Sequence, residues 1–169
     1  MRATAVLLVT AAPLGASATP VALAGADQDE ILGIARHYLQ NRAHKVTTGP
    51  QTPGFGVPVT EALAPKLAVH EAKLAAARAS ARTHYRAAVV ETRAVRFHAD
   101  QTGRTVVARV DEHAELYFAE PGSASHTGYG LPHLLTFTRT ADGWVLADVA
   151  LGHYKHCALL PETQRPSEC

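Results

Sequence analysis

The stretch RTVVARVDEHAELYF, residues 104–118, alternates apolar and polar side chains over most of its length. From residue 106 onward its even-numbered residues are apolar apart from Glu112, and the apolar ones are Val106, Ala108, Val110, Ala114, Leu116 and Phe118. From residue 109 onward its odd-numbered residues are polar or amphipathic, and they are Arg109, Asp111, His113, Glu115 and Tyr117. Because successive side chains of a strand point to opposite faces, this pattern predicts a long β-strand with one face on the core.

Three further strands are predicted around this one, with turns or loops between them. In chain order we expect a strand at residues 88–99, a turn at 100–103, the strand at 104–118, a loop at 120–130, a strand at 133–140, a turn at 141–143 and a strand at 144–151. The pair Asp142-Gly143 between two alternating runs is the strongest hairpin signal in the chain.

Two amphipathic helices are predicted before the strands. The first is capped by residues 27–29 and runs to about Lys45, and one stripe of it carries Ile31, Ala35, Tyr38, Arg42 and Val46. The second begins at Thr60 or Pro65 and runs to His84, and one face of it carries Leu63, Leu67, His70, Leu74, Ala77 and Ala81. Each apolar stripe is expected to pack on the sheet.

The segment TTGPQTPGFGVPVT, residues 47–60, separates the two predicted helices. Its prolines and glycines interrupt any regular period, so it is expected to be a loop. Phe55 and Val57 are apolar within it, and we therefore expect the loop to lie over the mouth of a groove.

Together these elements predict an α+β fold, with N-terminal helices packed on a curved, mainly antiparallel four-stranded sheet. This order resembles the nuclear transport factor two-like, or cystatin-like, cone fold of ketosteroid isomerases and polyketide-modifying cyclases. The ARHYLQNRA helix and the HLLTFTRTADGWVLAD strand pair also resemble the N-terminal region of secreted actinobacterial amidase-domain proteins, over residues 27–152. In such relatives the amidase domain would follow this region in the sequence. The resemblance covers only the region before that domain, and it therefore implies no amidase activity for residues 27–152.

The first 24 residues have the pattern of a secretory signal peptide. Arg2 is followed by the apolar run AVLLVTAAPLGA and by small-residue cleavage sites that end at Ala18 and Ala24. We favour cleavage after Ala24, which leaves a single α+β domain at residues 25–152 and a tail at 153–169. The protein is then expected to be secreted and extracellular. The apolar run is shorter than the roughly 20 residues that span a membrane, so no membrane span is expected.

The tail contains both cysteines, Cys157 and Cys169, and in an oxidising compartment such a pair predicts a disulfide that closes the tail. The chain also has 10 histidines, and His153 and His156 in the tail offer an alternative metal site. Recognised zinc sites have four ligands at recurrent spacings, which this segment does not supply. We therefore expect no metal and no cofactor.

The overall charge argues against two classes of partner. The formal net charge is +1, and no basic patch or stripe stands out in the sequence. Nucleic-acid binding is therefore not expected, because it depends on such a patch. Binding to an anionic membrane surface through a polybasic segment is not expected for the same reason.

The favoured function is a secreted, non-catalytic binding or interaction module for a small apolar ligand or an extracellular, cell-envelope partner. Its candidate ligand-binding residues are Tyr38, His70, Tyr85 and Tyr129. The enzyme alternative is a ketosteroid isomerase- or cyclase-like protein that acts on a small hydrophobic substrate. Its candidate catalytic residues are Asp111 or Glu115 as the base and Tyr117, Tyr85 or Tyr129 as the hydrogen-bond donor.

The polar face of residues 104–118 can be interpreted in two ways. It is either an active-site wall or a solvated outer face, and the apolar even-numbered face favours the second. The resemblance also implies a homodimer through the sheet face, with Arg109, His113 and Glu115 at the interface.

Overall fold

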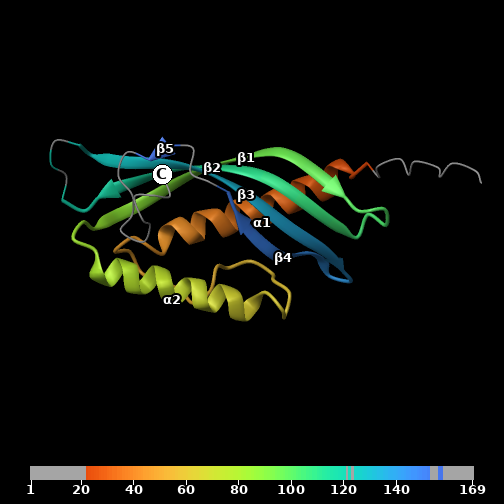
Figure 1. Ribbon diagram of the computed structural model, residues 1–169, viewed down its shortest axis with the longest axis horizontal. Coiled ribbons are helices and arrows are strands. Elements are labelled where there is room, and N and C mark those ends of the chain that lie inside the picture. The colour runs from red at the N-terminus through yellow and green to blue at the C-terminus, as the bar shows by residue number, and fades with distance from the viewer. Residues whose placement is uncertain (1–21, 121, 123, 153–155, 158–169) are drawn as a thin grey trace, which may run out of the picture.

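The computed structural model describes residues 22–120, 122, 124–152 and 156–157 (Figure 1). In chain order its elements are α1 Gly25–His44, α2 Ala64–Ser80, β1 Tyr85–Ala99, β2 Thr105–Phe118, β3 His126–Thr140, β4 Gly143–Leu151 and the short β5 His156–Cys157. The predicted α+β class and the order of helices before strands are confirmed. Neither helix within these residues has the length and apolarity that crossing a membrane requires.

The strands form one antiparallel sheet in the order β1-β2-β3-β4. Strand β5 pairs with Tyr129 and Gly130 of β3, beyond the point where β4 ends opposite His133. Both helices lie on the same side of the curved sheet (Figure 1). Helix α1 contacts β1, β2 and β4, and it therefore forms the layer next to the strands.

The helices cover the even-numbered face of β2. Every even-numbered residue from Val106 to Phe118 is buried, including Glu112. On the opposite face Arg109 and His113 are exposed, and Asp111 is partly exposed. The apolar alternation of the sequence therefore marks the core side of the sheet, and the polar residues form its outer face.

Strand β3 begins earlier than the sequence predicts, because residues 126–130 are strand and not loop. The backbone at Gly128 passes so close to β2 that an added Cβ would lie 3.1 Å from the carbonyl oxygen of Ala114. A glycine in a strand is often found at such a close approach of two backbones. The segment was interpreted as a loop because its composition, with Gly128 and Gly130, is typical of one. That prediction was wrong for residues 126–130.

Two hydrogen bonds connect the start of α1 to the β3–β4 hairpin. The Nε1–H of Trp144 donates to Oδ1 of Asp27 over 3.1 Å, and the backbone N–H of Trp144 donates to Glu30 over 2.9 Å. The hydrogen bond from Trp144 is the main cause that lowers the pKa of the Asp27 carboxyl. Asp27 was predicted to cap the helix, but the N-cap is Ala24 and it makes no side-chain capping bond. The Asp27 carboxylate binds the hairpin instead.

Several predictions concern residues outside the described part of the chain. The signal peptide at residues 1–24 falls almost entirely there, as do Cys169 and His153. Only the backbone strand is described at His156 and Cys157. The disulfide and the alternative metal site therefore stay predictions.

Candidate functional site

Glu112, the exception in the alternation of β2, lies at the centre of a buried polar cluster. Its carboxylate accepts a hydrogen bond from Tyr129 Oη over 2.9 Å and one from His133 Nε2 over 2.7 Å. The guanidinium of Arg42 lies 3.2 Å from the same carboxylate. All four residues are at most 5 % exposed. A charge this deeply buried is tolerated only when it is paired and hydrogen-bonded, as Glu112 is here.

The register of the sheet brings this polar cluster together. Glu112 of β2 faces Leu131 of β3, so Tyr129 and His133 flank it diagonally on the same face. Arg42 comes from the stripe of α1 that packs on the sheet. The helix α1 and the neighbouring strands β2 and β3 thus supply the four side chains.

Glu112 is ionised in this environment. Burial by itself raises the pKa of its carboxyl, but the positive charge of Arg42 and the hydrogen bonds from His133 and Tyr129 outweigh burial. The net effect is a lowered pKa. The buried Arg42–Glu112 contact is therefore a genuine ion pair at neutral pH.

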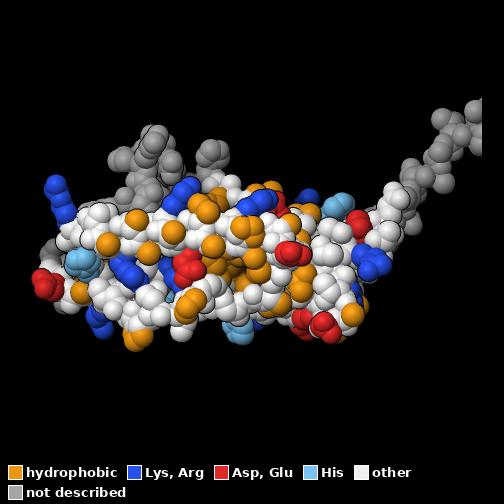
Figure 2. All heavy atoms as spheres, turned by 90° about the horizontal axis from the view of Figure 1, so that it is seen from below, with side chains coloured by type: hydrophobic (Ala, Val, Ile, Leu, Met, Phe, Trp, Pro, Cys, Tyr) orange, Lys and Arg blue, Asp and Glu red, His pale blue; other side chains and the backbone are white. Residues whose placement is uncertain are grey.

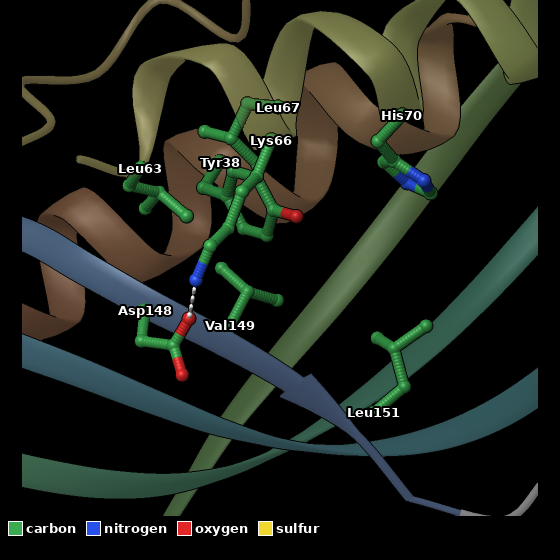
Figure 3. Close-up of a pocket in the computed structure, with 8 residues that line it drawn as sticks. All are labelled: Tyr38, Leu63, Lys66, Leu67, His70, Asp148, Val149 and Leu151. Atoms are coloured by element: carbon green, nitrogen blue, oxygen red, sulfur yellow. Dashed lines mark ion pairs between the residues drawn. The ribbon is translucent and has the colours of Figure 1, made fainter. Parts of the chain in front are cut away.

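A pocket of about 180 Å³ opens beside the polar cluster, between α2 and the end of β4 (Figure 3). It is lined by Tyr38, Leu63, Lys66, Leu67, His70, Asp148, Val149 and Leu151. Tyr38 lies one helical turn before Arg42, and Leu151 pairs directly with His133 across the β3–β4 ladder. The pocket and the polar cluster therefore share a wall.

The lining is mainly aliphatic, with two polar groups inside and an ion pair at the rim. The hydroxyl of Tyr38 and the imidazole of His70 point into the space between α2 and β4 (Figure 3). Lys66 of α2 and Asp148 of β4 form an ion pair of 3.6 Å, and both of these side chains are more than half exposed. Viewed from the side of α2, hydrophobic side chains gather near the middle of the molecule with charged ones around them (Figure 2).

Both polar groups inside the pocket are uncharged at neutral pH. Burial is the main cause that lowers the pKa of His70 to about 4, and the positive charge of Arg42 adds to it. Burial also raises the pKa of the Tyr38 phenol to about 12, with Glu112 adding to the effect and Arg42 opposing it. The pocket thus offers a neutral imidazole and a neutral phenol.

Phe55, from the loop that connects the helices, packs against the rings of both Tyr38 and His70. Its ring centroid lies 5.3 Å from that of Tyr38 and 6.0 Å from that of His70, and the ring is only 4 % exposed. Lys45 at the end of α1 lies over the same ring and pairs with Glu71 of α2 over 2.5 Å. The loop therefore packs into the structure and fixes one side of the pocket.

The structure brings together only some of the predicted site residues. Tyr38 and His70 line the pocket, whereas Tyr129 belongs to the polar cluster behind it. Tyr85 does not line the pocket; it packs on Phe118, with ring centroids 5.5 Å apart, in an apolar cluster that also includes the ring of Tyr129.

The predicted catalytic residues of the enzyme alternative lie on the outer face of the sheet. Asp111, Glu115 and Tyr117 are all on the face that the helices leave uncovered. The hydroxyl of Tyr117 donates to Glu115 over 2.7 Å. On the face that the helices cover, β2 carries the ionised carboxylate of Glu112. In the sequence Glu112 was visible as the single polar residue in an otherwise apolar alternation. Within the described residues, no three His, Cys, Asp or Glu side chains are placed to hold a metal ion.

No protein-family model matches the chain, and no curated protein matches it significantly. Among solved structures, the crystal structure of the Kfla4162 protein from Kribbella flavida matches with a TM-score of 0.47 and 18% sequence identity. The match covers 78% of this chain and 90% of that chain.

Acidification is expected to destabilise the fold through His70. In the folded protein its pKa is about 4 against an ordinary 6.5, so the unfolded chain takes up this proton first as the pH falls. The stabilising contribution is therefore complete above pH 6.5 and is lost between there and about pH 4. The full shift corresponds to about 3 kcal/mol, and because the ring is partly exposed we expect a loss of about 2 kcal/mol.

Urea unfolding at about pH 7.5 and pH 4.5 measures this effect. The variant His70→Gln should lose less stability between the two pH values than the parent. His98→Gln, at an exposed position of β1, should lose as much as the parent. An equal loss in all three proteins would contradict the role given to His70.

Proposed function

We propose that this chain is a non-catalytic binding module that takes a small apolar ligand in the pocket between α2 and β4. The observation that carries this proposal is an aliphatic pocket with two uncharged polar groups directed into it, Tyr38 and His70. Sites for small molecules have this composition, in which apolar lining supplies affinity and a few polar groups fix the orientation.

The size of the pocket suits a ligand of about one ring. A cavity of about 150 Å³ accommodates benzene, and drug-sized ligands occupy about 300 Å³ or more. At about 180 Å³ the pocket lies near the lower of these sizes. A ligand with one ring and one or two substituents fits this space.

The protonation states of the lining groups favour binding over catalysis. A general base works best with a pKa near the operating pH, and His70 with a pKa of about 4 is a weak base. Tyr38 with a pKa of about 12 is a weak acid. The ionised Glu112 is paired with Arg42 and is not among the residues that line the pocket.

The enzyme alternative has one observation in its favour, and it concerns the polar cluster. A carboxylate that orients an imidazole is the arrangement of many general bases, and Glu112 accepts from His133 in this way. The Nδ1 atom of His133 is buried and has no hydrogen-bond partner among the described residues. An isomerase or cyclase reaction would therefore use His133 as its base, and Glu112→Gln would abolish turnover of a small hydrophobic ketone.

The proposal also includes the fold family, the location and the oligomeric state of the module. The order of helices and strands is compatible with the nuclear transport factor two-like cone fold, and the first 24 residues support action outside the cell. A homodimer through the outer sheet face also belongs to the proposal. Val89, Val95 and Leu134 are exposed apolar residues. Arg109 and His113 are exposed on the outer face of β2.

Filling the pocket tests the proposed function. Val149→Phe adds bulk at a position that lines the pocket, and it should weaken binding of the probe p-cresol by about tenfold or more. Val89→Phe makes the same change at a position that is 55 % exposed on β1, and it should bind as the parent does. Amide chemical shifts during an NMR titration report the affinity, and a thermal melt checks that each variant folds. Unchanged binding in Val149→Phe would refute the pocket as the site.

A further inference from the structure

The hydroxyl of Tyr38 is a hydrogen-bond donor with no acceptor in the described part of the protein. Tyr38 is 1 % exposed, and its oxygen forms no hydrogen bond with any described residue. This oxygen is not one of the fully buried polar atoms that lack a partner, so water or a ligand in the pocket can reach it. The hydroxyl points into the pocket (Figure 3), so a ligand atom there is placed to accept its hydrogen.

The phenol ring is held in a fixed position before any ligand arrives. Tyr38 lies in the middle of α1, and its ring packs against Phe55 with centroids 5.3 Å apart. Phe55 in turn is held by the loop that Lys45 and Glu71 fasten to α2. A preorganised donor loses little freedom on binding, and it therefore selects ligands by geometry.

His70 adds a second contact to the same space from the other helix. Its imidazole is neutral, so one ring nitrogen donates a hydrogen bond and the other accepts one. Figure 3 shows His70 and Tyr38 directed into the same pocket from α2 and α1. A ligand in this pocket can accept a hydrogen bond from Tyr38 and can also accept from, or donate to, His70.

Charged ligands fit this pocket poorly. The positive charges of Arg42 and Lys73 oppose a proton on His70, and they would oppose a ligand ammonium in the same way. A ligand carboxylate would lose its water without gaining an unpaired cation among the lining residues, since Lys66 at the rim already pairs with Asp148. Arg42 behind the wall is likewise paired with Glu112.

We infer that the pocket selects one-ring apolar molecules that carry a single neutral oxygen, as in a phenol, an alcohol or a ketone, and that Tyr38 donates the hydrogen bond that recognises this oxygen. This inference rests on the proposed function and narrows its ligand class. Tyr38 is the specificity residue, and His70 is the secondary contact.

Matched probes separate this inference from the proposed function. p-Cresol and p-xylene have nearly the same shape, and only p-cresol carries an oxygen. We expect the parent protein to bind p-cresol about tenfold more tightly than p-xylene, and more tightly than benzoate or benzylamine. Tyr38→Phe should bind p-xylene as the parent does and should bind both probes within about twofold of each other. His70→Leu should reduce the preference for p-cresol by a smaller factor.

Each outcome of these NMR titrations has a definite meaning. If the parent binds p-xylene as tightly as p-cresol, the oxygen specificity is refuted and the apolar pocket stands. If benzoate binds more tightly than p-cresol, the exclusion of charge is refuted. If none of the probes binds, the proposed function itself fails. A Tyr38→Phe protein that keeps the full preference for p-cresol would overturn the role of Tyr38.

Discussion

Replacing Glu112 with alanine is expected to lower the free energy of unfolding by about 4 kcal/mol, because Arg42 then stays buried without its counter-charge. The substitution also leaves Tyr129 and His133 without the acceptor that both use. Urea unfolding measures the loss. Glu91→Ala removes a carboxylate from an exposed position of β1, and it should change stability by less than about 0.5 kcal/mol.

A double variant tests whether charge pairing is the cause. Arg42→Met combined with Glu112→Leu replaces the pair by apolar side chains of similar length, which is often nearly neutral for a buried ion pair. We expect it to be clearly more stable than Glu112→Ala and to fall short of the parent, since two hydrogen-bond donors lose their acceptor. A double variant as unstable as the sum of its single changes would show that Arg42 and Glu112 are not coupled.

Replacing Phe55 with alanine should lower the free energy of unfolding by about 3 kcal/mol. The ring is 4 % exposed and contacts both Tyr38 and His70, so its removal leaves a cavity at the back of the pocket. Binding of p-cresol should be lost at the same time, because the two polar groups lose the surface that positions them.

Graded variants make the effect of Phe55 specific. Phe55→Leu retains most of the buried volume and should cost about 1 kcal/mol. Val69→Ala, at a position of α2 that is 57 % exposed, should cost less than about 0.5 kcal/mol. A loss below about 1 kcal/mol for Phe55→Ala would mean that the loop is held by its polar contacts alone.

Local patterns in the sequence predict most of the fold. The alternation in residues 104–118 predicts β2, and Asp142-Gly143 predicts the hairpin at which Gly143 has a φ of +122°. The main error concerns residues 126–130, which were interpreted as a loop although Gly128 lies at a close approach of two strand backbones. Local composition cannot distinguish a glycine in a tight strand pair from one in a turn.

The site could be predicted only in part, because its parts meet through tertiary contacts. Tyr38 and His70 lay on apolar helical stripes and do line the pocket. Glu112 stood out as the one polar residue on an apolar face, but its partner Arg42 is 70 positions away in the sequence. A single sequence contains nothing that pairs these two residues, and the polar cluster therefore emerges only from the structure.

The way the pocket is assembled ties ligand binding to the integrity of the whole domain. Its walls come from α1, α2 and β4, and the loop that carries Phe55 supports them. No short segment of the chain contains the site, so unfolded and partly folded forms cannot hold the ligand. Ligand at about 100 times its dissociation constant would add about 2.7 kcal/mol to the stability of the native state by mass action. A ligand of the proposed site should therefore protect the protein from proteolysis, and protection in a crude extract would be a means of finding it.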